Sequence, residues 1–172
     1  MASPGPLNIL VVEDEVLLAA ALAFLIEEAG CHEVGHAMSS DEALAMATEL
    51  RPDLALVDVH LRDGPTGIDL ARTIANDCGG VALFMTANVK RLPDDFAGAC
   101  GVIGKPYSEH GVKMALRYLD VCLREGCAPG LPPAGLQLAP AWADRWGLGD
   151  LPRTAGARCG STPSARPQPS AR

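Results

Sequence analysis

Short, nearly uninterrupted aliphatic segments recur along the first 125 residues, each followed by a stretch with helical character. The clearest are ILVV at 9–12, LALV at 54–57 and VALFM at 81–85. Runs of four or five apolar residues without polar alternation are typical of parallel strands that helices cover on both faces. The sequence therefore predicts an α/β fold, in which a doubly wound five-stranded parallel sheet lies between two helical layers.

Local signals set the boundaries of these elements. Gly30 suits the end of the first helix, because glycine readily adopts the left-handed conformation found there. Ser39 and Glu42 have the spacing of a capping box, and the helix that they begin ends before Pro52. Pro93 leaves only a short, weak fourth helix. The expected strands are 9–12, 33–37, 54–57, 81–86 and 102–103, and the remaining expected helices are 15–29, 66–75, 89–97 and 112–124, the last with Ser108 as its cap.

The character of the sequence changes at residue 126. Residues 126–172 hold 7 glycines and 8 prolines among 47 positions. Aperiodic sequence with that share of Gly and Pro is usually disordered. Only 141–146, which contains two tryptophans, offers a helical turn. We therefore expect one folded domain over 7–125 and a Pro/Gly-rich, disordered extension over 126–172.

Charge and cysteine usage exclude several classes of function. Residues 1–125 carry a net charge of −10 and residues 126–172 one of +3. An acidic domain lacks the positive surface that nucleic acid requires, so direct DNA binding is not expected. The six cysteines show no C-x-x-C pair, and the longest apolar run, 16–26, is too short to cross a bilayer. We expect a cytoplasmic protein with reduced cysteines and no membrane contact.

Polar residues follow four of the five expected strands. Glu13 and Asp14 follow the first, Asp58 the third, Thr86 the fourth and Lys105 the fifth. Ligand sites in such sheets lie beyond the carboxyl ends of the strands, so these side chains are expected to converge. Three carboxylates would repel one another unless a divalent cation joined them, and hard oxygen ligands suit Mg²⁺. An aspartate can also act as a nucleophile toward phosphorus and form an acyl phosphate.

The sequence over residues 7–125 resembles the receiver domain of response regulators. The resemblance rests on ILVVEDE at 9–15, PDLALVDVHLRDG at 52–64, FMTA at 84–87 and GKPY at 104–107. It implies a flavodoxin-like sheet with strand order 2-1-3-4-5. The stretch GPTGID and the sequence FMTAN look most like receivers of alphaproteobacterial stress and relay systems.

Site residues carried over by this resemblance begin with Asp58 as the phosphoacceptor. Lys105 and Thr86 would contact the phosphoryl group, and Tyr107 would act with Thr86 as a switch. The peptide before Pro106 would be cis. The Mg²⁺ ligands would be Glu13, Asp14, Asp58 and the main-chain carbonyl of His60.

The resemblance implies a single-domain response regulator that is not an enzyme. The only reaction expected of it, besides accepting a phosphoryl group, is autodephosphorylation. Its phosphoryl donor would be a histidine kinase or a histidine phosphotransfer protein, and its output would be contact with an unidentified protein. The 18 residues between Thr86 and Lys105 are fewer than in chemotaxis-type receivers, so a short or irregular fourth helix is expected.

Two other functions stay open. One is a phosphorylation-independent adaptor in which the acidic site is a relic. The other is a phosphohydrolase with an aspartyl nucleophile, similar to haloacid-dehalogenase-like enzymes. Those enzymes carry a second Asp two residues after the nucleophile, and His60 stands there in this chain.

Overall fold

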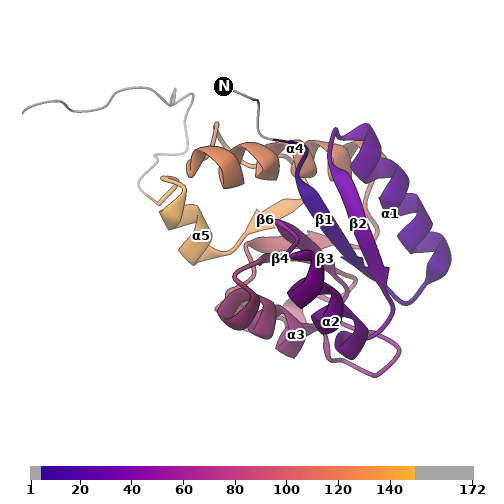
Figure 1. Cartoon of the computed structure of the whole chain (residues 1–172). Helices are drawn as coiled ribbons and strands as arrows, with labels where there is room; N and C mark the ends of the chain where they lie inside the picture. Colours follow the sequence, from indigo (N-terminus) through magenta and orange to yellow (C-terminus); the bar gives the residue numbers. More distant parts are fainter. Residues whose placement is uncertain (1–4, 150–172) are drawn as a thin grey trace, which may run out of the picture.

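In the computed structural model, which describes residues 5–149, six strands form one sheet with the order β2-β1-β3-β4-β5-β6 (Figure 1). Neighbours among the first five strands are parallel, and β6 is antiparallel to β5. The strands are β1 (Asn8–Val12), β2 (His32–Ala37), β3 (Leu54–Val57), β4 (Val81–Thr86), β5 (Gly101–Gly104) and β6 (Leu136–Leu138). The predicted order of the first five strands is confirmed, while the sheet has one strand more than expected.

Helices cover both faces of this sheet (Figure 1). Successive strand residues point to opposite faces, so Ile9 and Val11 of β1 pack in one core while Leu10 and Val12 pack in the other. The first core is closed by α1 and α4, and the second by α2 and α3. The helices are α1 (Val16–Glu28), α2 (Ser40–Leu50), α3 (Gly67–Thr73), α4 (Glu109–Glu125) and α5 (Pro140–Arg145). The doubly wound α/β prediction is therefore confirmed.

Two helix starts follow the predicted caps. The Ser39 hydroxyl accepts a hydrogen bond from the Glu42 amide at 3.3 Å, and the Ser108 hydroxyl accepts one from the Gly111 amide at 3.0 Å. These bonds satisfy amides that have no partner inside the first turn of a helix. The Glu42 carboxylate accepts from the Met38 amide at 2.8 Å. Capping therefore fixes where α2 and α4 begin.

The connection between β4 and β5 contains no α-helix. It holds two short 3₁₀ turns, Val89–Arg91 and Phe96–Gly98. Phe96 and Ala97 have φ values of 51° and 49°, a conformation that is strained for residues with a side chain. The predicted helix over 89–97 is therefore wrong, whereas the expected irregularity of this connection is confirmed. A π-helical turn, Ile74–Cys78, extends α3 on the same side of the sheet.

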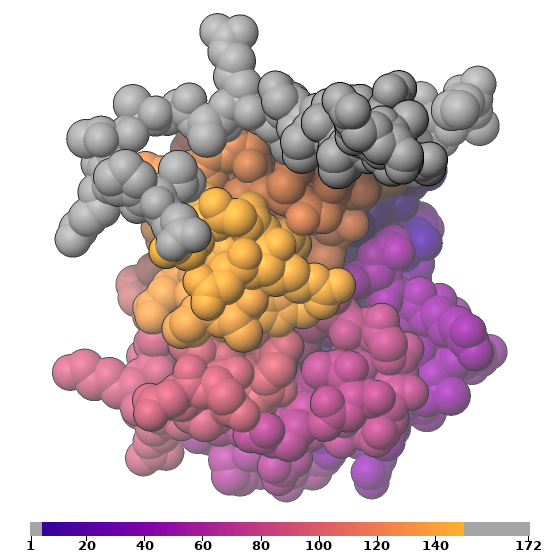
Figure 2. Space-filling view, turned by 90° about the vertical axis from the view of Figure 1, so that its left-hand side faces the viewer, coloured from indigo at the N-terminus to yellow at the C-terminus, as the bar shows by residue number. Residues whose placement is uncertain are grey.

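The expectation of a disordered extension from residue 126 is wrong for residues 126–149, which we call the C-terminal strap. Its strand β6 pairs with β5, and its helix α5 carries the chain to Trp146, which is 3% exposed. Figure 2 shows the strap lying against α4. The Pro/Gly count misled because the strap also carries apolar side chains that the open edge of β5 allows it to bury. Residues 150–172, the rest of the predicted extension, lie outside the described residues.

Membrane crossing is not a property of the described helices. None of the helices within residues 5–149 is long and apolar enough to span a bilayer.

Candidate functional site

The carboxyl ends of β1, β3, β4 and β5 meet at one edge of the sheet. Val12 of β1 is paired with Val57 of β3, which places the next residues, Glu13 and Asp58, side by side. The Asp58 amide donates to the Val12 carbonyl at 2.9 Å and continues this ladder. The Lys105 amide likewise donates to the Thr86 carbonyl at 2.8 Å. The sheet register therefore brings the predicted site residues together from positions far apart in the sequence.

Lys105 links the two carboxylates at the centre of the site. Its Nζ lies 2.7 Å from Oε2 of Glu13 and 2.6 Å from Oδ2 of Asp58. The side chain of Glu13 is 2% exposed, whereas that of Asp58 is 14% exposed. Burial disfavours the charged form of Lys105, but hydrogen bonds to Asp58 and Glu13 outweigh it and raise the pKa of Lys105 above its ordinary value. Asp58 is thus the more accessible carboxylate of a pair that shares one ammonium group.

Main-chain amides orient these carboxylates further. The His60 amide donates to Oδ1 of Asp58 at 3.2 Å, and the Glu15 amide donates to Oε1 of Glu13 at 3.1 Å. The main-chain carbonyl of Glu13 lies 2.6 Å from Nε2 of His36. This contact of His36 was missed in the sequence, where nothing distinguishes it from an ordinary strand residue. Each carboxylate therefore has one oxygen bound to Lys105 and the other bound to a backbone amide.

Thr86 and Tyr107 flank the ion pairs. Thr86 is 1% exposed, and its hydroxyl accepts a hydrogen bond from the Asn88 amide at 3.2 Å. The Tyr107 hydroxyl is buried and has no hydrogen-bond partner among the described residues. Burial is also the main cause that raises the pKa of Tyr107. The peptide between Lys105 and Pro106 is cis, as predicted.

The oxygen donors at this edge suit a hard cation. Within residues 5–149, no three His, Cys, Asp or Glu side chains form a group that could hold a metal ion by themselves. Mg²⁺ does not require such a cage, because it keeps several waters and uses one or two protein carboxylates. Glu13, Asp14 and Asp58 supply carboxylates of this kind at adjacent strand ends. The donor chemistry therefore fits Mg²⁺, with water as a large share of its ligands.

Two cavities differ in their relation to this site. One, of about 360 Å³, is lined by Leu18, Ala87, Lys105, Pro106 and Tyr107, directly beside the ion pairs.

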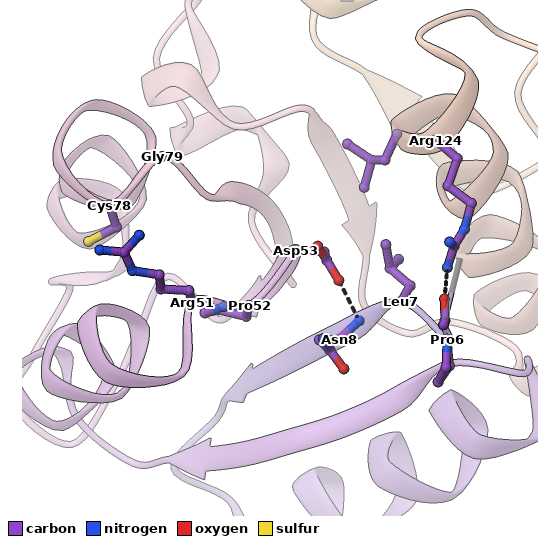
Figure 3. A pocket seen from close by; sticks show the side chains of 11 residues that line it. Pro6, Leu7, Asn8, Arg51, Pro52, Asp53, Cys78, Gly79 and Arg124 are labelled. Atoms are coloured by element: carbon purple, nitrogen blue, oxygen red, sulfur yellow. Dashed lines mark hydrogen bonds between the residues drawn. The ribbon is translucent and has the colours of Figure 1, made fainter. Parts of the chain in front are cut away.

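The larger cavity, of about 680 Å³, lies at the opposite end of the strands and contains none of the predicted site residues. Figure 3 shows Asn8 and Asp53 joined by a hydrogen bond in it, with Arg51 and Arg124 at its sides. Of the two cavities, only the smaller one is lined by predicted site residues, namely Lys105, Pro106 and Tyr107.

A doubly wound sheet with an acidic pair, an aspartate, a threonine and a lysine at successive strand ends defines a receiver. The family comparison agrees: residues 9–117 match the response regulator receiver domain. The chain belongs to this family of two-component signalling domains.

Several known proteins resemble the chain over this region. PhyR, the phyllosphere-induced regulator of Methylorubrum extorquens, is 31% identical over 67% of this chain and 44% of the relative. PdtaR, a transcriptional regulatory protein of Mycobacterium tuberculosis, is 36% identical over 60% of this chain and 51% of the relative. The chain thus spans about half the length of these relatives. The solved receiver domain of Erythrobacter litoralis PhyR is 30% identical, with a TM-score of 0.57 over 63% of this chain and 85% of that chain.

Proposed function

We propose that this chain accepts a phosphoryl group on Asp58 from a phosphohistidine and signals by contact with another protein. The observation that carries the proposal is the shared ammonium group of Lys105, which bridges the accessible Asp58 and the buried Glu13. Asp58 lies where a donor can reach it, and Lys105 lies where it can meet the charge of an arriving phosphoryl group. In this step an Asp58 oxygen bonds to phosphorus, the phosphorus–nitrogen bond breaks, and the donor histidine keeps the electron pair.

Glu13, Asp14, Asp58 and the main-chain carbonyl of His60 would hold Mg²⁺, which supplies charge neutralisation when bound. Lys105 would then exchange its contact with Asp58 for a phosphoryl oxygen. Thr86 would donate its hydroxyl proton to another phosphoryl oxygen, giving up its present role as acceptor from Asn88. Tyr107 would follow Thr86 as the second half of a switch, since its hydroxyl has no partner to lose among the described residues.

The first helix supports contact with a protein donor. Residues 16–26 of α1 contain no charged residue, and Leu17 and Phe24 are 85% and 62% exposed. These two positions are seven apart, so they lie on one face of the helix. Val16, 60% exposed, extends this apolar face toward the loop that holds Glu13. An exposed apolar face next to the acceptor suits a helical donor domain of a histidine kinase or phosphotransfer protein.

The output is proposed to be protein contact without direct DNA binding. Residues 1–125 are acidic, which disfavours binding to nucleic acid. Among the relatives, PhyR of Bartonella quintana is described as an anti-anti-sigma factor, and a variant of it is 27% identical to this chain. We propose that this chain likewise acts on a protein target, while its catalysis is limited to loss of its own phosphoryl group to water.

Labelling with radioactive acetyl phosphate tests this proposal. We expect Mg²⁺-dependent incorporation into the wild-type chain and none into Asp58→Asn. Asp53→Asn is the matched control, because Asp53 and Asp58 flank β3 at opposite ends and only Asp58 lies at the site. Labelling that persists in Asp58→Asn would refute the acceptor assignment. Unchanged affinity for a co-purified partner in Asp58→Ala would instead favour the phosphorylation-independent adaptor.

A further inference from the structure

The C-terminal strap occupies the edge of the sheet that is connected directly to the site. In β6, Leu136 pairs with Ile103 and Leu138 pairs with Gly101. Lys105 comes two residues after Ile103 in the chain. A shift of Lys105 would therefore also displace the end of β5, the strand with which β6 pairs.

The strap also contacts the other segment that leaves the site. The Trp142 indole donates a hydrogen bond to the Gly98 carbonyl at 3.1 Å, and the Ala139 amide donates to the Cys100 carbonyl at 2.9 Å. Gly98 and Cys100 belong to the irregular connection that begins just after Thr86. The strap therefore contacts both β5, which leads to Lys105, and the connection between β4 and β5, which begins after Thr86.

The core beneath the strap connects it to Tyr107. Trp146, Trp142 and Leu136 pack in the same apolar core as Tyr107, between the sheet and α4. The Tyr118 hydroxyl of α4 donates to the Gly130 carbonyl at 2.9 Å and holds the beginning of the strap. Tyr107 and the two tryptophans are therefore parts of one continuous apolar core.

We infer that the strap is a phosphorylation-sensitive cover of the β5 edge, closed in the resting protein and released when Asp58 is phosphorylated. Strand β6 has three residues and lies at the end of the sheet, and segments with few backbone contacts are the ones that open locally. Release would expose the unpaired backbone of β5, which is a template for another strand. The inference rests on the proposed function, because Asp58 must be the acceptor for it to operate.

The two tryptophans of the chain, Trp142 and Trp146, both lie in the strap and report on it without added labels. We compare acrylamide quenching of their fluorescence in the full chain with and without beryllofluoride and Mg²⁺, and measure acetyl phosphate labelling separately. The quenching constant is expected to rise about twofold or more, because local opening exposes Trp146, now 3% exposed. Asp58→Asn should show no rise. Unchanged quenching in a chain that is labelled at Asp58 overturns the inference alone, whereas a chain that is not labelled overturns the proposed function as well.

A pair of glycine variants tests the closed state independently of phosphorylation. A Cβ at Gly101 would clash with the Gln137 carbonyl oxygen of β6, whereas one at Gly104 would meet only the Val89 side chain at 3.5 Å. Gly101→Ala is therefore expected to give high quenching without beryllofluoride, and Gly104→Ala to behave like the wild type. Retained labelling at Asp58 shows that Gly101→Ala is folded. Quenching in folded Gly101→Ala that equals the wild-type value contradicts the inference.

A second variant opens the strap without crowding the backbone. Trp142→Phe removes the hydrogen bond to the Gly98 carbonyl and keeps an aromatic ring in the core. We expect amide exchange of residues 136–138 to be faster in Trp142→Phe than in the wild type. Equal exchange rates in the two proteins would count against the strap being held by this contact.

Discussion

Replacing Trp146 by alanine tests whether the C-terminal strap is part of the cooperative fold. Trp146 is 3% exposed, lies in the core with α4, and contacts Trp142 in a tilted arrangement with ring centroids 5.0 Å apart. Truncating a fully buried tryptophan to alanine costs about 3–5 kcal/mol. If the strap detaches by itself, the loss cannot exceed the free energy that docks it.

We therefore expect a loss of about 2–3 kcal/mol in the free energy of unfolding, somewhat below the range for a buried tryptophan in a core that cannot open locally. For a domain of this size, each kcal/mol corresponds to roughly 3 °C, so the melting temperature should fall by about 6–9 °C. Urea titration followed by far-ultraviolet circular dichroism measures the loss without relying on tryptophan fluorescence.

Leu131→Ala is the matched control for this measurement. Leu131 belongs to the same strap but is 66% exposed. Its truncation should change the free energy of unfolding by less than about 0.5 kcal/mol. If Trp146→Ala is no less stable than Leu131→Ala, the strap is not part of the cooperative unit, and the packing argument for it fails.

Three further perturbations examine the site and its surroundings. Lys105→Ala leaves Glu13 and Asp58 without their shared cation, so thermal unfolding should show that the free energy of unfolding falls by about 2–3 kcal/mol, less than for a fully buried ion pair. Mg²⁺ should stabilise this variant more than the wild type, because it would replace the missing positive charge. Equal stabilisation of the two proteins by Mg²⁺ would contradict the proposed metal ligands. Ser39→Ala removes the cap of α2 and should cost about 1 kcal/mol in urea unfolding, without changing labelling by acetyl phosphate. Hydrogen bonds from Ser40 hold the pKa of Asp63 in the folded protein below its usual 3.8. The stability that this carboxylate contributes is therefore fully present above pH 3.8 and is lost as the pH falls through the lower pKa of the folded state. The free energies of unfolding of Asp63→Asn and the wild type should therefore differ at neutral pH and converge in strong acid. A difference that stays constant with pH would show that the Asp63 carboxylate is not the cause.

The sequence alone determined the five parallel strands of the sheet and the edge at which Asp58 and Lys105 meet. Aliphatic runs such as 54–57 are fully buried between two helical layers, and this environment tolerates little besides apolar residues. Parallel strands all end at the same edge, so Asp58 and Lys105 converge although 47 positions separate them. The capping serines Ser39 and Ser108 were also predictable, because capping depends on the few residues next to the helix end.

Tertiary structure decided what local pattern does not encode. Which oxygen of Asp58 meets Lys105, and that Glu13 shares the same ammonium group, depends on side-chain positions across three strands. The strap was misjudged for the same reason. Its Gly and Pro residues disfavour structure locally, whereas Leu136 and Trp146 are buried only because β5 leaves an edge open beside α4. Composition describes a segment in isolation, and burial depends on the surface that the rest of the chain provides.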